Sequence, residues 1–236
     1  MRLRTLRPEA HPQSWGITDL YHGYTEYSAL PENVRVHYGK ILRRDNHTCQ
    51  YCGFRSELYQ EIHHINHNHA DFDVNNLVCA CTLCHRSFHL NALHIAKAAE
   101  LIFFPELTQA EVNHLCRALA VAKYRGHDVF TGQHPIAKHA FDTVWTNSMA
   151  GRISPVRNIM GDDMLMNLSA FAQILIDLQQ AGEGQGNQDD SGKHYLDNFK
   201  IFHFPDSLQL QTQYWADAVF PPFAEWDKYA EILKIN

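Results

Sequence analysis

Two C-x-x-C pairs constrain the fold of this 236-residue chain more than any other feature of its sequence. Cys49 and Cys52 form the first pair. Cys81 and Cys84 form the second, and 28 residues separate the inner cysteines. Two such pairs supply the four thiolates that tetrahedral zinc prefers, and a shell of four thiolates leaves no coordination position for chemistry. The spacing therefore predicts a structural zinc site, with four ordinary buried thiols as the alternative.

The composition is that of a folded protein in a reducing compartment. Apolar residues make up 45% of the chain and charged residues 19%, which is typical of globular proteins and not of disordered ones. No stretch approaches the roughly 18 consecutive apolar residues that span a membrane, and no apolar run follows the basic N-terminal residues. We therefore expect a cytoplasmic protein without a transmembrane segment, in which paired cysteines bind metal.

The expected fold class is α+β, a small zinc module followed by a mainly helical extension. Metal binding would replace the hydrophobic core that a module of this size can hardly supply. Five regions are expected along the chain: an N-terminal arm at 1–32, the zinc module at 33–95, a helical region at 96–181, a flexible linker or loop at 182–192 and an aromatic-rich segment at 193–236.

Apolar periodicity predicts the secondary structure of the module. Residues 31–45 have helical spacing, and two short apolar runs between Glu61 and Cys81 fit two strands joined by a loop. A helix is expected from Cys84 through about Leu93. Beyond the module, Thr108 and Glu111 form a T-x-x-E capping box, and two further helices are expected at 136–150 and 164–181.

Five polar side chains follow in order between and after the cysteine pairs: His63, His64, Asn76, His85 and His89. Because His85 and His89 are four residues apart, they lie on one face of a helix and can bind one metal ion. His63 can complete a three-ligand site, which keeps positions open for water and a phosphate oxygen. The pattern predicts a second divalent site, of the catalytic kind.

His63 and His64 are neighbours on an expected strand, so their side chains should point to opposite faces. His64 is then free to act as a base, because an ordinary histidine pKa of about 6.5 suits proton abstraction from water near neutral pH. Asn76 would brace the loop through side-chain hydrogen bonds. Each histidine alone is more often structural or exposed, and only the ordered set indicates a site.

The string formed by C-x-x-C, HHI and NLVCAC-x-x-CH-x-x-x-H resembles the HNH nucleases, including their colicin branch. The resemblance implies a ββα-metal fold in which His63, His85 and His89 bind Mg²⁺, Mn²⁺, Ni²⁺ or Zn²⁺. It also implies that His64 activates the attacking water and that Asn76 orients the loop. The chain is thereby a candidate endonuclease, a metal-dependent phosphodiester hydrolase acting on DNA.

Charge gives this nuclease interpretation little support. The formal net charge is -6, and the segment from Val34 to His94 is close to neutral, with five acidic and six basic residues. Arg43, Arg44 and Arg86 are candidate phosphate contacts, although a solvated face explains them equally well. Since a free-standing nuclease usually has a basic tract, a partner would have to bring the nucleic acid.

A wider set of strings, RRDNHTCQYCGF, YQEIHHIN and NNLVCACTLCHRSFHL with PELTQAEVNHLCRAL downstream, is similar to the DotN/IcmJ family of type IVB secretion systems. This resemblance covers about residues 38–125. It implies a zinc-containing scaffold subunit of the coupling complex, with protein partners and a location at the inner membrane through that complex. The two resemblances thus imply two functions, a phosphodiester hydrolase or a non-catalytic scaffold.

The segment after residue 193 is dense in aromatic residues: Tyr195, Phe199, Phe202, Phe204, Trp215, Phe220, Phe223, Trp226 and Tyr229. These rings either pack back on the preceding helices or form an interface for a partner. Both interpretations remain open from the sequence.

Overall fold

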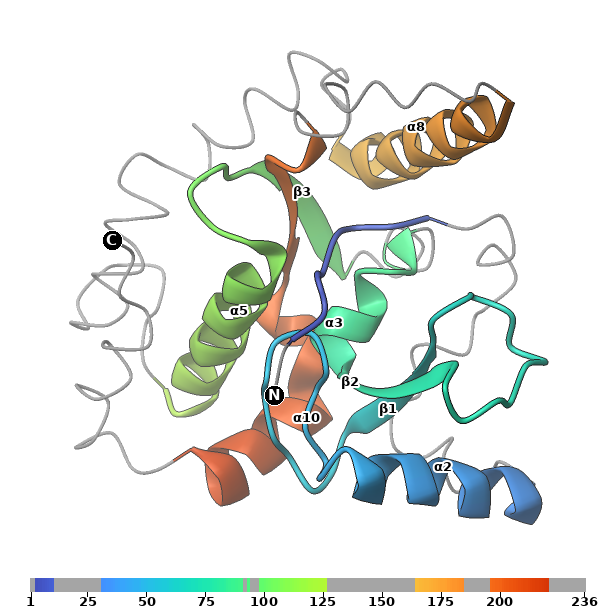
Figure 1. Ribbon diagram of the computed structural model, residues 1–236. Coiled ribbons are helices and arrows are strands. Elements are labelled where there is room, and N and C mark those ends of the chain that lie inside the picture. The colour runs from blue at the N-terminus through green and yellow to red at the C-terminus, as the bar shows by residue number, and fades with distance from the viewer. Residues whose placement is uncertain are drawn as a thin grey trace.

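The fold is α+β, as expected, and consists of two small antiparallel sheets with helices packed around them (Figure 1). The computed structural model describes residues 3–10, 31–90, 93, 98–126, 164–184 and 196–220. The helix expected at 136–150 lies outside the described residues, and so does most of the expected linker at 182–192.

The first sheet pairs β1 (Gln60–His64) with β2 (Leu77–Cys81), and α2 (Glu32–Arg44) packs against it. The two strands are antiparallel, with His63 opposite Val78. Ile41 of α2 contacts the sheet at Ile62 and Leu77, which form a small apolar cluster. Both strands and the helix that precedes them lie where the apolar periodicity predicts them.

A short helix, α3 (Thr82–Arg86), begins directly after β2. The pattern predicted one helix from Cys84 through Leu93, but α3 ends at Arg86, and helical residues resume only at Leu90. Ser87 follows α3, and its hydroxyl donates to the Leu83 carbonyl (3.0 Å), which competes with continuation of the helix. His85 and His89 therefore do not lie on one continuous helix.

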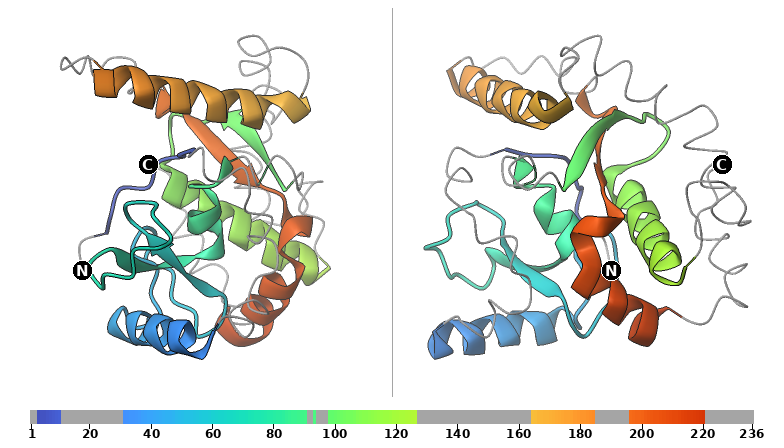
Figure 2. Two further views of the ribbon diagram at one scale, coloured as in Figure 1. Left: turned by 90° about the vertical axis from the view of Figure 1, so that its right-hand side faces the viewer. Right: turned by 180° about the vertical axis from the view of Figure 1, so that it is seen from behind.

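The second sheet pairs two strands from distant parts of the sequence, β3 (Ala99–Phe103) and β4 (Phe199–His203). The region after residue 95 was expected to be mainly helical, and these strands were missed. Figure 2 shows α5 (Gln109–Tyr124) and α8 (Met164–Gly184) around this sheet. The predicted capping box of α5 is present, with Thr108 and Glu111 bonded reciprocally. Since α8 ends at Gly184, the first residues of the expected linker are helical.

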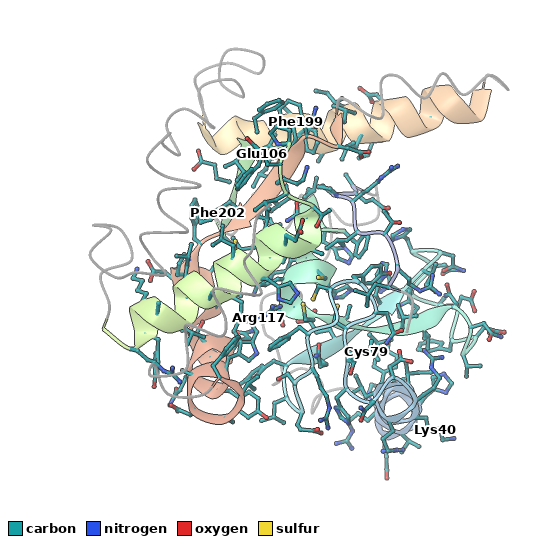
Figure 3. All side chains as sticks on the ribbon, turned by 60° about the vertical axis from the view of Figure 1, so that its left-hand side comes forward. Lys40, Cys79, Glu106, Arg117, Phe199 and Phe202 are labelled. Atoms are coloured by element: carbon teal, nitrogen blue, oxygen red, sulfur yellow. The ribbon has the colours of Figure 1, made fainter. Side chains whose placement is uncertain are left out.

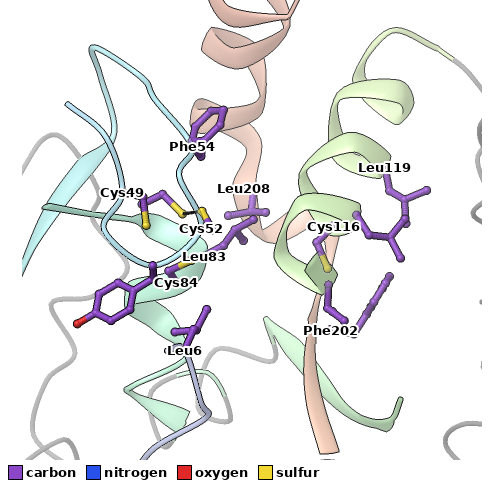
Figure 4. Packing of buried hydrophobic residues seen from close by; sticks show 14 of the residues in the cluster. Leu6, Cys49, Cys52, Phe54, Leu83, Cys84, Cys116, Leu119, Phe202 and Leu208 are labelled. Carbon is purple, nitrogen blue, oxygen red and sulfur yellow. Dashed lines mark hydrogen bonds between the residues drawn. The ribbon is translucent and has the colours of Figure 1, made fainter. Parts of the chain in front are cut away.

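The main hydrophobic core joins the cysteines to α5 and to the chain after β4, and Figure 4 shows part of it. That chain continues through η3 (Pro205–Leu208), α10 (Gln209–Tyr214) and η4 (Trp215–Val219). Phe202, Leu208 and Trp215 are buried in the same cluster as the four cysteines. The aromatic residues described in the C-terminal segment therefore pack back on the body of the protein, whereas Tyr195 and the rings after Phe220 lie outside the described residues.

Within the described part of the chain, no helix is both long and apolar enough to cross a membrane.

Candidate metal centre

The four predicted cysteines converge on one point. The Sγ atoms of Cys49, Cys52, Cys81 and Cys84 all lie within 4.8 Å of one another, and all four residues are buried. The sulfurs of Cys52 and Cys81 are 3.7 Å apart. Zinc held tetrahedrally at about 2.3 Å from each sulfur requires sulfur–sulfur separations of about 3.8 Å. The cluster therefore has the donor set and the spacing to hold a metal such as zinc.

Local backbone geometry brings each pair of cysteines together. Between Cys49 and Phe54 the chain folds back on itself: the Gly53 amide donates to the Cys49 carbonyl, and the Cys49 amide donates to the Phe54 carbonyl. Gly53 has φ +76°, a left-handed conformation that side chains rarely adopt. The second pair spans the junction where β2 ends at Cys81 and α3 begins.

The sulfurs can all be deprotonated only if a cation offsets their charge. Burial raises the pKa of the Cys49 and Cys84 thiols well above the ordinary cysteine value. Hydrogen bonds from the neighbouring sulfurs lower the pKa of Cys52 instead. Four thiolates in this buried volume repel one another, so a divalent cation is what holds all four deprotonated together.

Helix α5 contributes polar groups to this centre that the sequence did not reveal. Nη2 of Arg117 donates to Sγ of Cys81 (3.1 Å), and Nδ2 of Asn113 donates to Sγ of Cys84 (3.4 Å). Figure 3 shows Arg117 extending from α5 toward the sulfur atoms. A helical pattern gives no sign of these contacts, because the partner cysteines of Asn113 and Arg117 lie 29 and 36 residues away in the sequence.

Arg117 keeps its positive charge although it is fully buried. Burial by itself lowers the pKa of its guanidinium, but the charges of the four nearby thiolates raise it above the ordinary value. The guanidinium also lies 3.7 Å from the ring centroid of Phe54 and 5.2 Å from that of Trp215. These aromatic faces stabilise a cation that has no access to water.

The predicted metal-binding histidines lie next to one another. The ring centroids of His63 and His85 are 5.6 Å apart, and those of His85 and His89 are 4.9 Å apart. All three residues are buried. Their nitrogens are less converged than the sulfurs, since the cysteines form the one compact group of metal-binding atoms found among the described residues.

Two of these imidazoles are oriented through their Nδ1 atoms. Nδ1 of His85 donates to the Glu61 carboxylate (2.5 Å), and Nδ1 of His63 is hydrogen-bonded to the Tyr51 hydroxyl (2.5 Å). Nε2 of both rings is buried without a hydrogen-bond partner among the described residues. A carboxylate behind an imidazole is the usual arrangement around a metal-bound histidine. Burial also lowers the pKa of His63, which keeps the ring neutral as a ligand must be.

His64 faces away from His63, as the strand alternation predicted. Its ring lies 6.2 Å from that of Tyr38, 5.9 Å from Phe72 and 4.8 Å from His69. Burial, followed by the charge of His69, lowers the pKa of His64 to about 4. The ring is therefore neutral at pH 7, but it is a weaker proton acceptor than the ordinary histidine assumed from the sequence.

Asn76 makes the loop-bracing bonds expected of it. Its Oδ1 accepts from the Asn66 amide (2.9 Å), and its Nδ2 donates to the Asp71 carbonyl (3.0 Å). Both bonds close the loop between β1 and β2. The loop that carries His67 and His69 is thereby fixed beside His64.

The three arginines that were candidate phosphate contacts occupy different environments. Arg43 is exposed on α2. Arg44 donates to the Asp45 carboxylate and to the carbonyls of Val74 and Leu77, which ties α2 to the loop before β2. Arg86 is buried, with a hydrogen bond to the Ser207 carbonyl. The structure therefore gives Arg44 and Arg86 structural partners.

No protein-family model matches the chain. The chain is 37% identical over 220 residues to the type 4 apparatus protein DotN of Legionella pneumophila subsp. pneumophila strain Philadelphia 1, an alignment that covers 92% of this chain and 91% of that protein. Because this identity extends over nearly the whole length of both proteins, the chain belongs to the DotN family.

Proposed function

We propose that this chain is a structural subunit of a type IV secretion apparatus, held in shape by zinc at its four cysteines. The observation that carries the proposal is the alignment with a type 4 apparatus protein over nearly the whole length of both chains. Such coverage includes the C-terminal half, which a nuclease module does not need. The finer assignment, a scaffold of the coupling complex that binds protein partners, follows from the resemblance of residues 38–125 to that family.

The cysteine cluster supports a structural role for the metal. A shell of four thiolates is closed, so the ion contributes to folding and has no position for a substrate. The cluster also belongs to the main core, together with α5 and Trp215. Loss of the metal would therefore disturb the surfaces that the C-terminal half presents to partners.

The test is affinity purification of the tagged chain from its native host, with recovery of secretion-apparatus proteins as the readout. Metal analysis of the same sample should give about one zinc per chain. The His64→Ala variant should recover the same partners, because His64 lies outside the zinc centre. The proposal fails if wild-type protein recovers no apparatus proteins, or if folded protein holds less than about half an equivalent of zinc.

A second candidate function is metal-dependent phosphodiester hydrolysis at the histidines. The observation that favours it is the pair of buried Nε2 atoms of His63 and His85, whose Nδ1 atoms are already held by Tyr51 and Glu61. With His89, they would hold one divalent ion, which would polarise a phosphate oxygen when bound. His64, neutral at pH 7, would accept a proton from water.

Plasmid cleavage separates the two candidates. Purified protein is incubated with plasmid DNA and Mg²⁺, Mn²⁺ or Ni²⁺, and His64→Ala serves as the matched variant with an intact zinc centre. Hydrolysis at this site predicts nicking by the wild type and a loss of about 10²- to 10⁴-fold in the variant. Equal rates in the two proteins would assign any cleavage to a contaminant and leave the structural role.

A further inference from the structure

We propose that Arg117 and Asn113 of α5 complete the zinc centre, by donating hydrogen bonds to two of its thiolates and by offsetting the negative charge of the cluster. The inference rests on the proposed metal at the four cysteines, and it extends the centre beyond residues 49–84. It makes α5 part of the metal site, so that metal binding and the packing of the C-terminal half depend on one another.

The surroundings of Arg117 require an anionic partner. The side chain is 0% exposed, and no carboxylate of the described residues lies within salt-bridge distance of its guanidinium. A buried charge without a counter-charge is strongly destabilising. The Cys81 sulfur, 3.1 Å from Nη2, is the group that meets this need, because four thiolates around one divalent ion retain net negative charge.

The position of the guanidinium is fixed from its other sides. Nη1 donates to Nδ1 of His114 (3.0 Å), and Nε2 of His114 donates to the Cys52 carbonyl (2.9 Å). These two bonds specify a single tautomer of His114. Phe54 lies against the flat face of the guanidinium. Arg117 is thus connected to both cysteine pairs, directly to Cys81 and through His114 to the turn of Cys52.

Asn113 is oriented by a second chain of hydrogen bonds that starts on β4. The side-chain amide of Gln109 bonds both the amide and the carbonyl of Ile201, which determines which of its ends is the donor. Nε2 of Gln109 then donates to Oδ1 of Asn113 (2.9 Å). Because Oδ1 is the acceptor, Nδ2 is left facing the Cys84 sulfur. β4 therefore sets the donor that reaches the centre.

The two chains of bonds distinguish this arrangement from ordinary core packing. The oriented donors of Arg117 and Asn113 draw electron density away from the thiolates that they contact. Hydrogen bonds of this kind to metal ligands typically change metal affinity by about 10- to 100-fold. An arginine that only fills space would leave the affinity and the electronic spectrum of the bound metal unchanged. The two cases therefore differ in measurable ways.

The experiment compares the full-length wild type with Arg117→Met, Arg117→Lys and Asn113→Ala. Lys123→Met is the matched control, since it removes a positive charge from the same helix where Lys123 pairs with Asp206 at the surface. Zinc affinity is measured by competition with a chromophoric chelator. Arg117→Met should bind zinc about 10- to 100-fold more weakly, Arg117→Lys and Asn113→Ala by less, and Lys123→Met as the wild type does.

Cobalt substitution gives a second readout that does not depend on stability. In Co²⁺-loaded protein the thiolate-to-metal charge-transfer band should shift in Arg117→Lys and Asn113→Ala and stay in place in Lys123→Met. These two variants decide the matter if Arg117→Met does not fold. Affinities within about twofold of the wild type together with unshifted bands would overturn the inference alone. A wild-type protein without metal at the cysteines would overturn the proposed zinc and this inference with it.

Discussion

Cys84 and His85 are neighbours on α3, yet they belong to two clusters whose metal-binding atoms are brought together to different extents. The cysteine cluster brings four sulfurs within 4.8 Å and is surrounded by the main core and by donors from α5. The histidine cluster brings rings to about 5 Å centroid separations, but its nitrogens do not gather to the same extent. The fold therefore brings the metal-binding atoms of the cysteines closer together than those of the histidines.

Sequence separation explains part of this difference. The cysteines of each pair are three residues apart, the first pair in a turn and the second where β2 passes into α3, so only the relative placement of two units has to be set. The histidines come from β1, from α3 and from the chain after the break at Ser87. The short α3 means that His85 and His89 do not share a continuous helix face. Four-residue spacing alone was therefore a weaker predictor than the paired cysteines.

Replacing one cysteine should produce the largest effect. Cys81→Ser removes a thiolate and leaves the buried charge of Arg117 without its counter-charge. The protein should therefore lose its metal and its cooperative thermal transition. The reason is one of magnitude: structural zinc contributes about 10 to 16 kcal/mol, which is comparable with the whole stability of a domain. Metal analysis and near-UV circular dichroism measure both losses.

Cys79→Ala is the matched control, since Cys79 is buried on the same strand but lies outside the cluster. It should keep its metal. If Cys81→Ser melts at the wild-type temperature with zinc bound, the cysteine cluster is not what holds the core together.

Replacing His203 tests how the burial of a histidine, without a metal ion, changes the stability of the protein with pH. His203 lies on β4, fully buried, and burial lowers its pKa to about 3. Below about pH 6.5 the unfolded chain binds a proton at this histidine, whereas the folded chain does not. The free energy of unfolding is therefore highest above that pH and decreases as the pH drops toward 3. The loss is about 1.4 kcal/mol for each unit of pKa difference.

His203→Leu should therefore lose less stability than the wild type between about pH 7 and about pH 5, as measured by urea unfolding. The metal is lost equally from both proteins on acidification, and its contribution cancels in the difference. Parallel stability curves for the two proteins would show that the pKa of His203 is the same in the folded and the unfolded chain, which would contradict the expected effect of burial.

His85→Ala tests the weaker cluster directly. The variant should keep its zinc at the cysteines and bind an added divalent ion at least about tenfold more weakly than the wild type, as titration calorimetry with Mn²⁺ measures. His67→Ala is the control, because its ring lies 5.2 Å from that of His63 but is not a proposed ligand. Unchanged Mn²⁺ binding in His85→Ala would place the ion elsewhere.

The smallest effect is expected at the start of α5. Thr108→Ala removes the hydroxyl that accepts from the Glu111 amide, which should lower the free energy of unfolding by about 1 kcal/mol. Zinc content should stay at the wild-type level, because Arg117 lies more than two turns further along the helix. A measurable loss of zinc affinity would mean that the whole of α5, and not its donors alone, supports the cysteine cluster.

Local patterns predicted the parts of the molecule whose partners are close in sequence. These parts depend on residues close by in the sequence or on one connecting loop: the two cysteine pairs, α2, the pairing of β1 with β2, and the capping box at Thr108. The pairing of β3 with β4 was missed, since each is a five-residue, only partly apolar segment that periodicity alone does not distinguish from helix. The donors of α5 were missed for a related reason: an arginine in an amphipathic pattern indicates exposure, and only the folded chain places Arg117 beside a thiolate.

The pairing of β3 with β4 also determines when, during synthesis, the protein can finish folding. Leu101 faces Ile201, so the ribosome must make about a hundred further residues before the partner of β3 exists. Until then α5 has neither Ile201 for Gln109 nor Trp215 for Arg117. Contacts of such long range slow folding and leave apolar surface open to aggregation. A nascent chain of this family should thus depend on chaperones until its last fifth has been synthesised.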